Sequence, residues 1–484
     1  MAELPDWVRR QKVKGTEVRR MAGGTYYLYK VTSVWDPAKG RARKITEGFL
    51  GRITPEGLVK PKRERILDGL KEISVKEFGA SSFVLQFCPD IIDLVRRHYP
   101  DYWREVTVLS IVRLFHSSPL KNVIHHYGSS HLSDAISGAE VSPRSLSMML
   151  HSIGMRRERM VEFMKNFVGN GEEEHAVIDL THFFSLSEGV ITATLGHNSD
   201  EEYVPQVNFV LILSLGKRMH PSFFRLVPGS INDVSTIPAT IREAGVTRAV
   251  VIGDKGFYSK RNASFLEENG LEYVLPLKRS NSLIDYSPLS RGTRKRMDGH
   301  FLFEKRVIWY SEGAEEEEGT HVILFLDNSL RTEEERDIIS NVDGGGRLTM
   351  RDYYDRQRSM GTISVATNTQ FRPQKVFELL KSRVNVEQVF DTMKNTLNAD
   401  RTYMRDDAHL QGWMLVNFVS LLMYYKVYGL LLSKDMLERN SPKDVLLHLS
   451  RVYKLRIGGG WNLSEVPKAS RLLAKQLGVE LHIT

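Results

Sequence analysis

The sequence has almost no cysteine, and this excludes several kinds of site before any motif is considered. Cys88 is the only cysteine among 484 residues, so neither a disulfide within the chain nor a zinc site made of several thiolates can form. Proteins without disulfides are typical of reducing compartments. We therefore expect an intracellular, cytoplasmic protein.

The sequence also lacks a clear membrane segment. Residues 1–15 have no apolar core of the kind that a signal peptide requires. The longest apolar run, residues 413–432, is about as long as a membrane span, but it contains Asn417, Ser420 and Lys426. We expect this run to form a buried helix in a large core.

Several common catalytic motifs are absent as well. There is no Gly-x-x-x-x-Gly-Lys loop for nucleotide phosphates and no Gly-x-Ser-x-Gly turn for a catalytic serine. The histidines His125, His126, His175 and His182 do not have the spacing of a zinc-binding helix, and we expect most of them to be structural. Nucleotide hydrolysis and serine-hydrolase chemistry therefore have no support.

The sequence does have a basic N-terminal part. Lys and Arg outnumber Asp and Glu by 67 to 59, a net charge of +8 that suits a polyanionic partner but is small for this length. Strand-like segments at 25–33 and 47–51 flank a turn at 36–40 and predict a hairpin. Residues 1–74 thus form a predicted basic module, for which a plain solvated hairpin is the alternative. Its candidate phosphate contacts are Arg9, Arg10, Arg41, Arg43 and Lys44.

Residues 75–172 have the apolar periodicity of helices. The pattern predicts helices at 91–98, 103–116 and 159–167. Between the last two, Ser142 and Pro143 start a helix after a glycine-containing break, a layout that resembles a helix-turn-helix. Arg144 would then contact DNA; ordinary helix packing is the alternative.

From Ala176 the pattern changes to strands. Segments 176–181, 189–195, 207–215 and 222–227 predict an antiparallel meander, and strands near 250 and 273 alternate with helices at 235–244 and 260–268. This order predicts an α/β fold in which Asp179 and Asp254 lie at neighbouring strand ends. Asn232 and Asp233 are interpreted as a turn and helix cap rather than as metal ligands.

Residues 283–365 interrupt this order. Apolar segments at 300–311 and 320–327 predict strands, with the acidic residues 315–318 in a solvated turn between them. We expect a β-rich insertion in which Trp309 packs in the core.

The helix predicted at residues 382–397 carries a third carboxylate. Its apolar residues recur at helical spacing: Val386, Val389, Phe390, Met393 and Leu397. Arg383, Glu387 and Lys394 are one and two turns apart and are expected to share a face. An ordinary salt-bridged helix on the surface is the alternative.

Asp179, Asp254 and Glu387 could converge at one edge of the sheet. Three hard oxygen ligands suit Mg²⁺ or Mn²⁺. Two such ions would activate a water or a 3′-hydroxyl and stabilise the leaving oxygen of an in-line phosphodiester displacement. The sequence thus predicts metal-dependent phosphodiester chemistry.

These motifs, in this order, resemble the DDE transposases of prokaryotic insertion sequences. One subgroup has a β-strand insertion, an Asp-x-Gly-[Tyr/Phe] element and a Tyr-x2-Arg-x3-Glu-x6-Lys signature. The first element is met by Asp254, Gly256 and Phe257. The signature is met by Arg383, Glu387 and Lys394, whereas Leu380 stands at the tyrosine position. The resemblance extends from about residue 176 to 432.

The resemblance implies an RNase H-like catalytic core at residues 173–282 and 366–432, interrupted by the insertion at 283–365. A helical DNA-binding region at 75–172 and a helical C-terminal segment at 433–484 complete the expected domains. In such a core Asp179, Asp254 and Glu387 would be catalytic and hold two Mg²⁺ or Mn²⁺ ions. Arg383 and Lys394 would contact DNA phosphates near the cut.

The implied function is DNA transposition: binding of terminal inverted repeats, hydrolysis at the element ends, often through a DNA hairpin, and attack of the 3′ ends on target DNA. The implied partners are double-stranded DNA and a second copy of the chain, at the nucleoid of a prokaryotic cytoplasm and without a nucleotide cofactor. Two alternatives stay open: a catalytically silent DNA-binding protein derived from a transposase, and an RNase H-like nuclease without strand transfer. In relatives an aromatic residue of the insertion stacks on an extruded base, which is the alternative role for Trp309.

Overall fold

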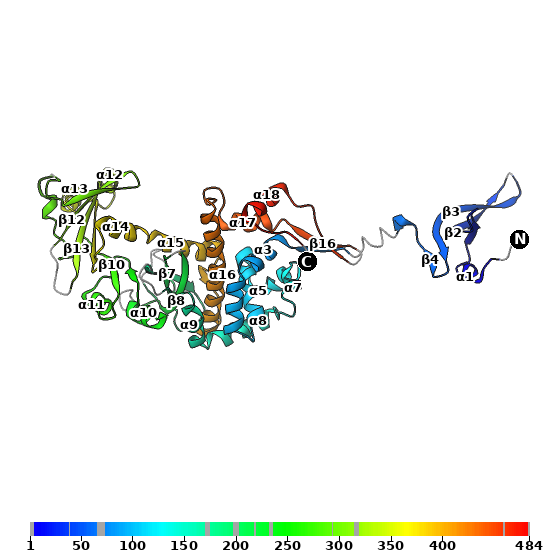
Figure 1. Ribbon diagram of the computed structural model, residues 1–484, viewed down its shortest axis with the longest axis horizontal. Coiled ribbons are helices and arrows are strands. Elements are labelled where there is room, and N and C mark those ends of the chain that lie inside the picture. The colour runs from blue at the N-terminus through cyan, green and yellow to red at the C-terminus, as the bar shows by residue number, and fades with distance from the viewer. Residues whose placement is uncertain are drawn as a thin grey trace. The chain divides into compact units, whose positions relative to one another are not determined.

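The computed structural model describes residues 4–37, 39–64, 73–169, 175–196, 203–216, 219–231, 236–292, 294–313, 319–457 and 460–482. The chain divides into two compact units (Figure 1). Unit 1 comprises residues 1–77, 452–467 and 481–484, and unit 2 comprises residues 78–451 and 468–480. The finer division expected from the sequence stays a prediction. The predicted acidic turn at 315–318 and the Asn232–Asp233 turn lie outside the described residues.

Unit 1 contains the hairpin predicted from the basic N-terminal sequence. Strands β2 (Tyr26–Asp36) and β3 (Arg41–Thr54) pair antiparallel, and β1 (Thr16–Arg20) and β4 (Gly57–Val59) complete the order β1-β2-β3-β4. Both strands of the hairpin are longer than predicted, because their pairing continues along the whole of β2. Helix α1 (Asp6–Arg9) contributes Val8 to a small core with Tyr26, Leu28 and Ile53.

A second sheet of unit 1 joins segments that are far apart in the sequence. Strand β16 (Tyr453–Ile457) pairs antiparallel with both β5 (Ser74–Glu77) and β17 (Gly460–Leu463). The predicted helical segment at 433–484 thus contains two strands in addition to its helices α17 (Pro442–Leu449) and α18 (Lys468–Leu477). The buried Lys454 places Nζ 4.6 Å from the ring centre of Trp461, a cation–π contact across the hairpin that favours strand pairing here.

Within the described ranges, unit 2 is built on a ten-stranded sheet. Its strand order is β11-β12-β13-β14-β10-β9-β6-β7-β8, and β15 (Arg401–Thr402) pairs with β6. The other strands are β6 (His175–Ser185), β7 (Gln206–Ser214), β8 (His220–Pro228), β9 (Val250–Ile252), β10 (Glu272–Pro276), β11 (Gly299–Phe303), β12 (Arg306–Glu312), β13 (His321–Asp327) and β14 (Thr362–Thr367).

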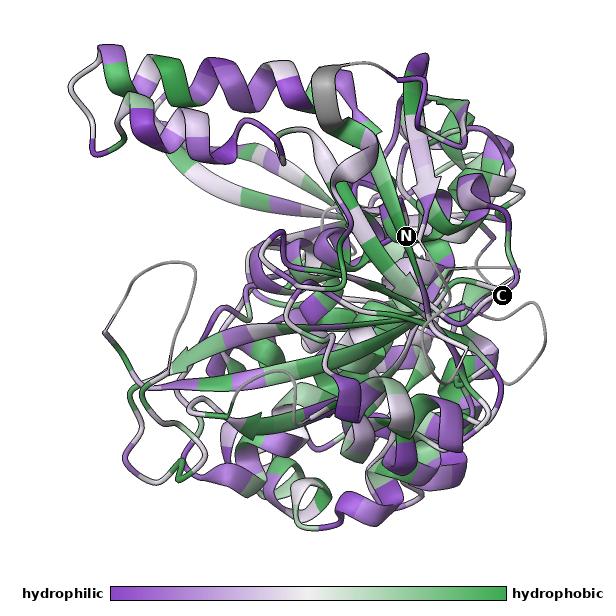
Figure 2. Cartoon of the chain, turned by 90° about the vertical axis from the view of Figure 1, so that its left-hand side faces the viewer, coloured by the Kyte–Doolittle hydropathy of each residue, from purple (hydrophilic) through white to green (hydrophobic). Residues whose placement is uncertain are grey.

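The middle of this sheet has mixed strand directions. Strands β6, β7 and β8 form the predicted antiparallel meander, while β9 runs parallel to β6 and β10 runs parallel to β9. Every residue of β7 is buried, and Figure 2 shows the sheet strands coloured mainly as hydrophobic. A strand buried along its whole length is one that is covered on both faces. The chain is thus a mixed α/β protein whose central sheet is consistent with the expected RNase H-like core.

One predicted strand of the meander is not formed. Residues 189–195 make turns, with an isolated bridge between Thr194 and Gln206. The Asp407 carboxylate accepts hydrogen bonds from the backbone N–H groups of Ile191 and Thr192, each at 3.1 Å. Because a side chain from a distant helix binds these donors, a neighbouring strand cannot use them.

The region predicted as a β-rich insertion is partly helical. Strands β11, β12 and β13 are present as expected, but β13 pairs with β14, so all three extend the central sheet. Helices α12 (Asn328–Asp343) and α13 (Met350–Arg356) follow. Asp327 caps the start of α12, and Thr349 forms a capping box with Asp352 at the start of α13. These caps explain why the chain leaves the sheet at this point.

Further helices complete unit 2. They include α3 (Gly79–Phe87), α4 (Pro89–His98), α5 (Trp103–Phe115), α6 (Val123–Gly128), α7 (Leu132–Ala135), α8 (Pro143–Gly154), α9 (Arg157–Lys165), α10 (Ile237–Ala244), α11 (Lys260–Glu268), α14 (Pro373–Lys381), α15 (Val384–Asp391) and α16 (Asp407–Ser433). The helices predicted at 91–98, 103–116, 159–167, 235–244 and 260–268 are all present, with ends that differ by at most two residues.

The predicted order of a helix, a glycine-containing break and a second helix is present as α7 and α8, and a helix-turn-helix role in DNA binding stays a prediction. Helix α7, at the position of its first helix, has a single turn, and α8 packs along α16 with Leu146, Leu150 and Ile153 buried. The start of α8 is as predicted, since the Ser142 side chain accepts a hydrogen bond from the backbone N–H of Ser145. Burial of its apolar face makes α8 a core helix of unit 2.

Helix α16 contains the longest apolar run and is buried, as predicted. Among the described residues it is the one helix that is long and apolar enough to cross a membrane, but 72% of its most apolar window is buried inside the protein. It packs against α5, α8 and β8. Its hydropathy is therefore that of a core helix with apolar neighbours on several sides.

Candidate active site

Asp179 and Asp254 occupy matching positions on neighbouring parallel strands. Val177 of β6 pairs with Ile252, the last residue of β9, and each aspartate lies two residues further along its own segment, at 179 and 254. The prediction that Asp179 ends its strand is wrong, because β6 continues to Ser185. Since β9 stops at Ile252, however, β6 has a gap on that side between Val177 and Phe184, where β15 begins to pair with it, and Asp179 lies in this gap near Asp254.

Arg383 brings the third carboxylate to this gap. Its Nη1 atom lies 3.3 Å from Asp179 Oδ2 and 2.8 Å from Asp254 Oδ1, and its Nη2 atom lies 2.6 Å from Glu387 Oε1. Arg383 immediately precedes α15 and Glu387 is one helical turn further on. The structure therefore assembles the three predicted acidic residues around one guanidinium group.

The three carboxylates differ in exposure. The Asp179 side chain is 10% exposed, against 40% for Asp254 and 53% for Glu387. Burial raises the pKa of Asp179 to about 7, and the negative charges of Asp254 and Glu387 add to that effect; the Arg383 guanidinium and the N–H of Leu180 oppose it. A buried carboxylate with such a pKa holds either a proton or a cation at neutral pH.

The apolar stripe of the predicted helix is buried as expected, at Val386, Val389, Phe390, Met393 and Leu397. The helix changes its form along this stripe, because α15 is followed by a π-helical turn at residues 392–396. Such a turn shifts the direction of the side chains that follow. Lys394 Nζ lies 3.6 Å from Asp400 Oδ1, so Lys394 forms an ion pair with Asp400.

Two other residues singled out in the sequence are buried or partly buried. Leu380, at the tyrosine position of the signature, is 9% exposed. Trp309 is partly buried and packs against an apolar cluster that contains Leu277, Val322 and Leu324, in agreement with the prediction of core packing.

The predicted DNA-contacting residues outside the acidic site lie in both units and are all exposed. Arg9 and Arg10 lie at α1, whereas Arg41, Arg43 and Lys44 follow one another along β3. Arg144 lies in α8 of unit 2. The structure thus places the strand residues close together, while contact of any of them with DNA stays a prediction.

Sequence reasoning missed a second group of side chains that could bind a metal. His151, Asp406 and His409 place one ligand atom each within 4.8 Å of the others. The Asp-x2-His spacing of the last two, at a helix start, is a local signal, since an N-cap residue and the third helical residue face each other. His151 comes from a distant helix, so no local spacing could have indicated it.

Comparison with known families now adds to this geometry. The family described as the transposase DDE domain matches residues 175–423, just over half of the chain, and this range includes all three carboxylates. The chain belongs to the DDE transposase family. Membership implies DNA transposition by a metal-dependent enzyme that hydrolyses phosphodiesters with divalent ions.

Among solved structures, this DDE transposase is similar to the piggyBac transposase in its synaptic complex with hairpin DNA. The identity is 11%, the TM-score is 0.41, and the similarity covers 78% of this chain and 76% of that chain. No curated protein matches the sequence.

Proposed function

We propose that this transposase binds the terminal inverted repeats of its element, cleaves at the element ends and joins the 3′ ends to target DNA. The observation that carries the proposal is the convergence of Asp179, Asp254 and Glu387 on one guanidinium group, at N–O distances from 2.6 to 3.3 Å. Three carboxylates at one sheet edge provide the concentrated negative charge that metal-dependent phosphodiester chemistry requires.

The donor set fits Mg²⁺ or Mn²⁺. The three acidic side chains present carboxylate oxygens that already surround a cation, and these hard metals prefer oxygen ligands. Asp179, Asp254 and Glu387 would hold two such ions. When bound, the ions would supply the Lewis acidity that activates the attacking oxygen and offsets the charge of the leaving oxygen.

Arg383 has a part both before and after metal binding in this proposal. In the metal-free site its single positive charge faces three carboxylates, which leaves the group negative and attractive to further cations. Once its carboxylate partners bind metal, the planar guanidinium is free to contact a DNA phosphate through two parallel hydrogen bonds. The same side chain would thus hold the carboxylates together and position the substrate.

Lys394 would contact a second phosphate. Its side chain is 19% exposed, and its pair with Asp400, at 3.6 Å, is longer than a hydrogen bond. A lysine held this loosely can exchange its partner for a phosphate oxygen. The proposal therefore keeps the phosphate-binding role expected from the signature, although Lys394 does not touch Glu387.

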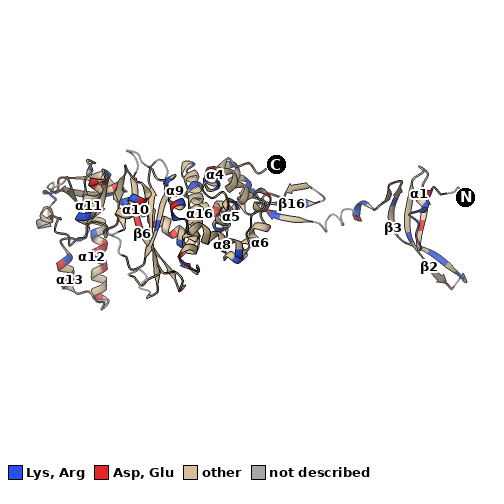
Figure 3. Cartoon of the chain, turned by 90° about the horizontal axis from the view of Figure 1, so that it is seen from below, with Lys and Arg blue, Asp and Glu red and all other residues tan. Residues whose placement is uncertain are grey.

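We assign duplex recognition to the outer part of the β2–β3 hairpin. Residues 41–49 of β3 are all exposed, and Figure 3 shows Lys and Arg along this hairpin. Arg43 pairs with Val34 across the strands and shares a face with Arg41 and Ile45, so one face is both basic and apolar. A two-stranded ribbon fits the DNA major groove, where arginine reads base edges and phosphates.

By the same proposal, two copies of the chain bridge two DNA ends, with one active site for each end. No energy cofactor is required, because strand transfer exchanges one phosphodiester for another. The reaction would take place at the nucleoid of a prokaryotic cytoplasm. Its products, joined at new sites, distinguish it from the action of a simple nuclease.

The test is a cleavage assay on duplex DNA that carries the flanking inverted repeats of the element. It is run with Mg²⁺, with EDTA and with the variant Asp254→Ala. We expect cutting at the repeat boundary and joining to target DNA only for the unmodified protein with Mg²⁺. Binding without cutting would support the catalytically silent alternative, and cutting without joining would support the nuclease.

A second variant separates the metal site from the fold. Glu387→Gln should abolish cleavage and leave DNA binding intact, because the half-exposed carboxylate serves the metal. Glu378→Gln is the matched control: it lies one helix earlier, where its Oε1 accepts a hydrogen bond from Gln374 at 3.0 Å. Unfolding of Glu387→Gln, with Glu378→Gln folded, would support the surface salt-bridge interpretation.

A further inference from the structure

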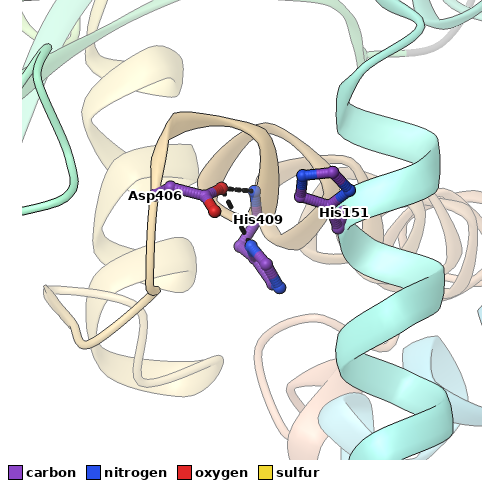
Figure 4. Close-up of side chains that lie close together, drawn as sticks. All are labelled: His151, Asp406 and His409. Carbon is purple, nitrogen blue, oxygen red and sulfur yellow. Dashed lines mark hydrogen bonds and ion pairs between the residues drawn. The ribbon is translucent and has the colours of Figure 1, made fainter.

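The start of α16 carries a group of metal-ligating side chains that shares no residue with the three carboxylates (Figure 4). It consists of His151 from α8 and of Asp406 and His409 from the start of α16, with one ligand atom from each within 4.8 Å of the other two. We propose that these side chains bind one transition-metal dication of the Zn²⁺ type. This site goes beyond the proposed DNA chemistry and does not depend on it.

Two of the three ligands are oriented by the cap of α16. Asp406 is the N-cap residue, and its Oδ1 atom accepts a hydrogen bond from the backbone N–H of His409 at 2.9 Å. The same Oδ1 lies 2.8 Å from His409 Nδ1. The helix cap therefore aims a carboxylate and an imidazole nitrogen at one position before any ion is bound.

The third ligand is held by the closest approach of two helices. A β-carbon on Gly154 of α8 would overlap the carbonyl oxygen of Ala408, and one on Gly412 of α16 would overlap that of Leu150. The helices thus meet backbone to backbone beside the cluster, which fixes the spacing of the side chains between them. The ring centres of His151 and His409 lie 5.0 Å apart. Ligands on rigid, closely packed helices form a preorganised site.

The other nitrogen of His409 has the partner that a metal ligand needs. Nε2 lies 3.1 Å from Ser147 Oγ, on α8 one turn before His151. A ligating histidine usually donates its second N–H to a nearby acceptor, which fixes the ring and its tautomer. With a metal at Nδ1, the neutral ring carries its proton on Nε2 and donates it to Ser147. Without a metal, the opposite tautomer would donate Nδ1–H to Asp406 Oδ1, which lies 2.8 Å away.

The chemistry of this donor set selects the class of metal. Two imidazoles and one carboxylate are ligands typical of Zn²⁺ and related transition metals, whereas Mg²⁺ prefers oxygen alone. His151 is exposed and His409 is 8% exposed, so an ion can enter from solvent and reach a partly enclosed site. Water would complete the coordination of the three protein ligands.

A metal here would tie together three parts of unit 2. It would link α8 to α16 directly. Asp407, next to the ligand Asp406, also accepts hydrogen bonds from the backbone of Ile191 and Thr192. These residues belong to the loop that follows β6, the strand of Asp179. We therefore infer a stabilising role for the metal at this junction.

The test is a Zn²⁺ titration of the full chain after EDTA treatment, in excess Mg²⁺, which would compete for oxygen ligands such as the three carboxylates. Calorimetry gives the stoichiometry and affinity, and thermal unfolding gives the shift in Tm. We expect one Zn²⁺ per chain and a higher Tm for the parent protein. His151→Asn should weaken Zn²⁺ binding about 100-fold or more and lose the Tm shift, because one of three ligands is removed.

The control is His125→Asn, which replaces another exposed histidine of unit 2 and should leave Zn²⁺ binding unchanged. Ser147→Ala should weaken binding about tenfold through the orientation of His409. Equal Zn²⁺ affinity and stoichiometry in His151→Asn and the parent, or no Zn²⁺ uptake by the parent, would overturn the proposal. Unchanged affinity in Ser147→Ala would overturn the assignment of Nδ1 as the ligand atom.

Discussion

Arg383 Nη1 lies 2.8 Å from Asp254 Oδ1, so a basic residue of the helix signature stands in the centre of the acidic site. The same guanidinium contacts Asp179 and Glu387. Its spacing in the sequence indicates the contact with Glu387, but the contacts with the aspartates arise because α15 packs against β6. Arg383 thus holds the three carboxylates together, and by the proposal above it would compete with metal ions for them.

Replacing Arg383 with Ala should destabilise the metal-free protein and tighten metal binding. Loss of charged hydrogen bonds in a partly buried site costs about 1–3 kcal/mol of unfolding free energy. Because the metal no longer displaces a guanidinium, we expect its Kd to fall about tenfold, the equivalent of about 1.4 kcal/mol. Thermal unfolding in EDTA and Mn²⁺ calorimetry measure the two effects. Weaker Mn²⁺ binding by Arg383→Ala than by the parent would contradict the competition.

The pKa of Asp179, raised to about 7 by burial, predicts how the stability of the metal-free protein depends on pH. The folded state binds this proton more tightly than the unfolded chain does, since the ordinary value is 3.8. The stabilisation is thus complete below pH 3.8 and is lost as the pH rises through 7. Relative to the parent, Asp179→Asn should gain stability between pH 5 and pH 8. A difference in Tm that is the same at both pH values would exclude this pKa.

The acidic site was predicted from local sequence patterns that match elements of the structure. Asp254 follows a short apolar strand, and the helical spacing of Val386, Val389 and Phe390 gave the buried face that turns Glu387 outward. Such spacing follows from the number of residues per helical turn or per strand repeat. It can therefore be recognised without knowledge of tertiary contacts. It therefore identified the residues that the structure brings together.

The secondary-structure predictions that were wrong have two different physical causes. The strand expected at 189–195 is absent because Asp407, from a distant helix, binds its backbone donors, and no local pattern could show that contact. The missed helix α12 is different, since Asp327 and the residues after it contain a cap signal in the sequence itself. The π-helical turn at residues 392–396 was not predicted either, since the apolar spacing of residues 382–397 is that of a regular helix.

The crossing of α8 and α16 can be tested with two glycines. In Gly154→Ala the new β-carbon overlaps the carbonyl oxygen of Ala408, and we expect a loss of about 1–3 kcal/mol in unfolding free energy. Gly429→Ala, in α16, has nothing within 4 Å of its β-carbon. Because alanine has a higher helix propensity than glycine, this replacement should stabilise the protein by about 1 kcal/mol. Urea denaturation measures both; a Gly154→Ala protein as stable as the parent would show that the helices do not meet this closely.

The outer part of the β2–β3 hairpin should supply both charge and stacking to DNA binding. Arg41 and Arg43 share an exposed face, so replacing both with Ala should weaken duplex binding. The slope of log K against log salt should fall by about 0.9 for each phosphate that the variant no longer neutralises. Trp35, 63% exposed on the same hairpin, is uncharged. Trp35→Ala should therefore lower affinity without changing that slope, because stacking releases no counterions.

The control for these variants removes an equally exposed charge from the other unit. Arg351 in α13 has a side chain that is 90% exposed and pairs with Asp355 at 3.9 Å, so Arg351→Ala should leave duplex affinity and its salt slope unchanged. Fluorescence anisotropy with labelled repeat DNA at several salt concentrations gives all the slopes in one experiment. If Arg351→Ala lowers the slope as much as the replacement of Arg41 and Arg43, the binding is a general response to net charge, and the hairpin has no special part in it.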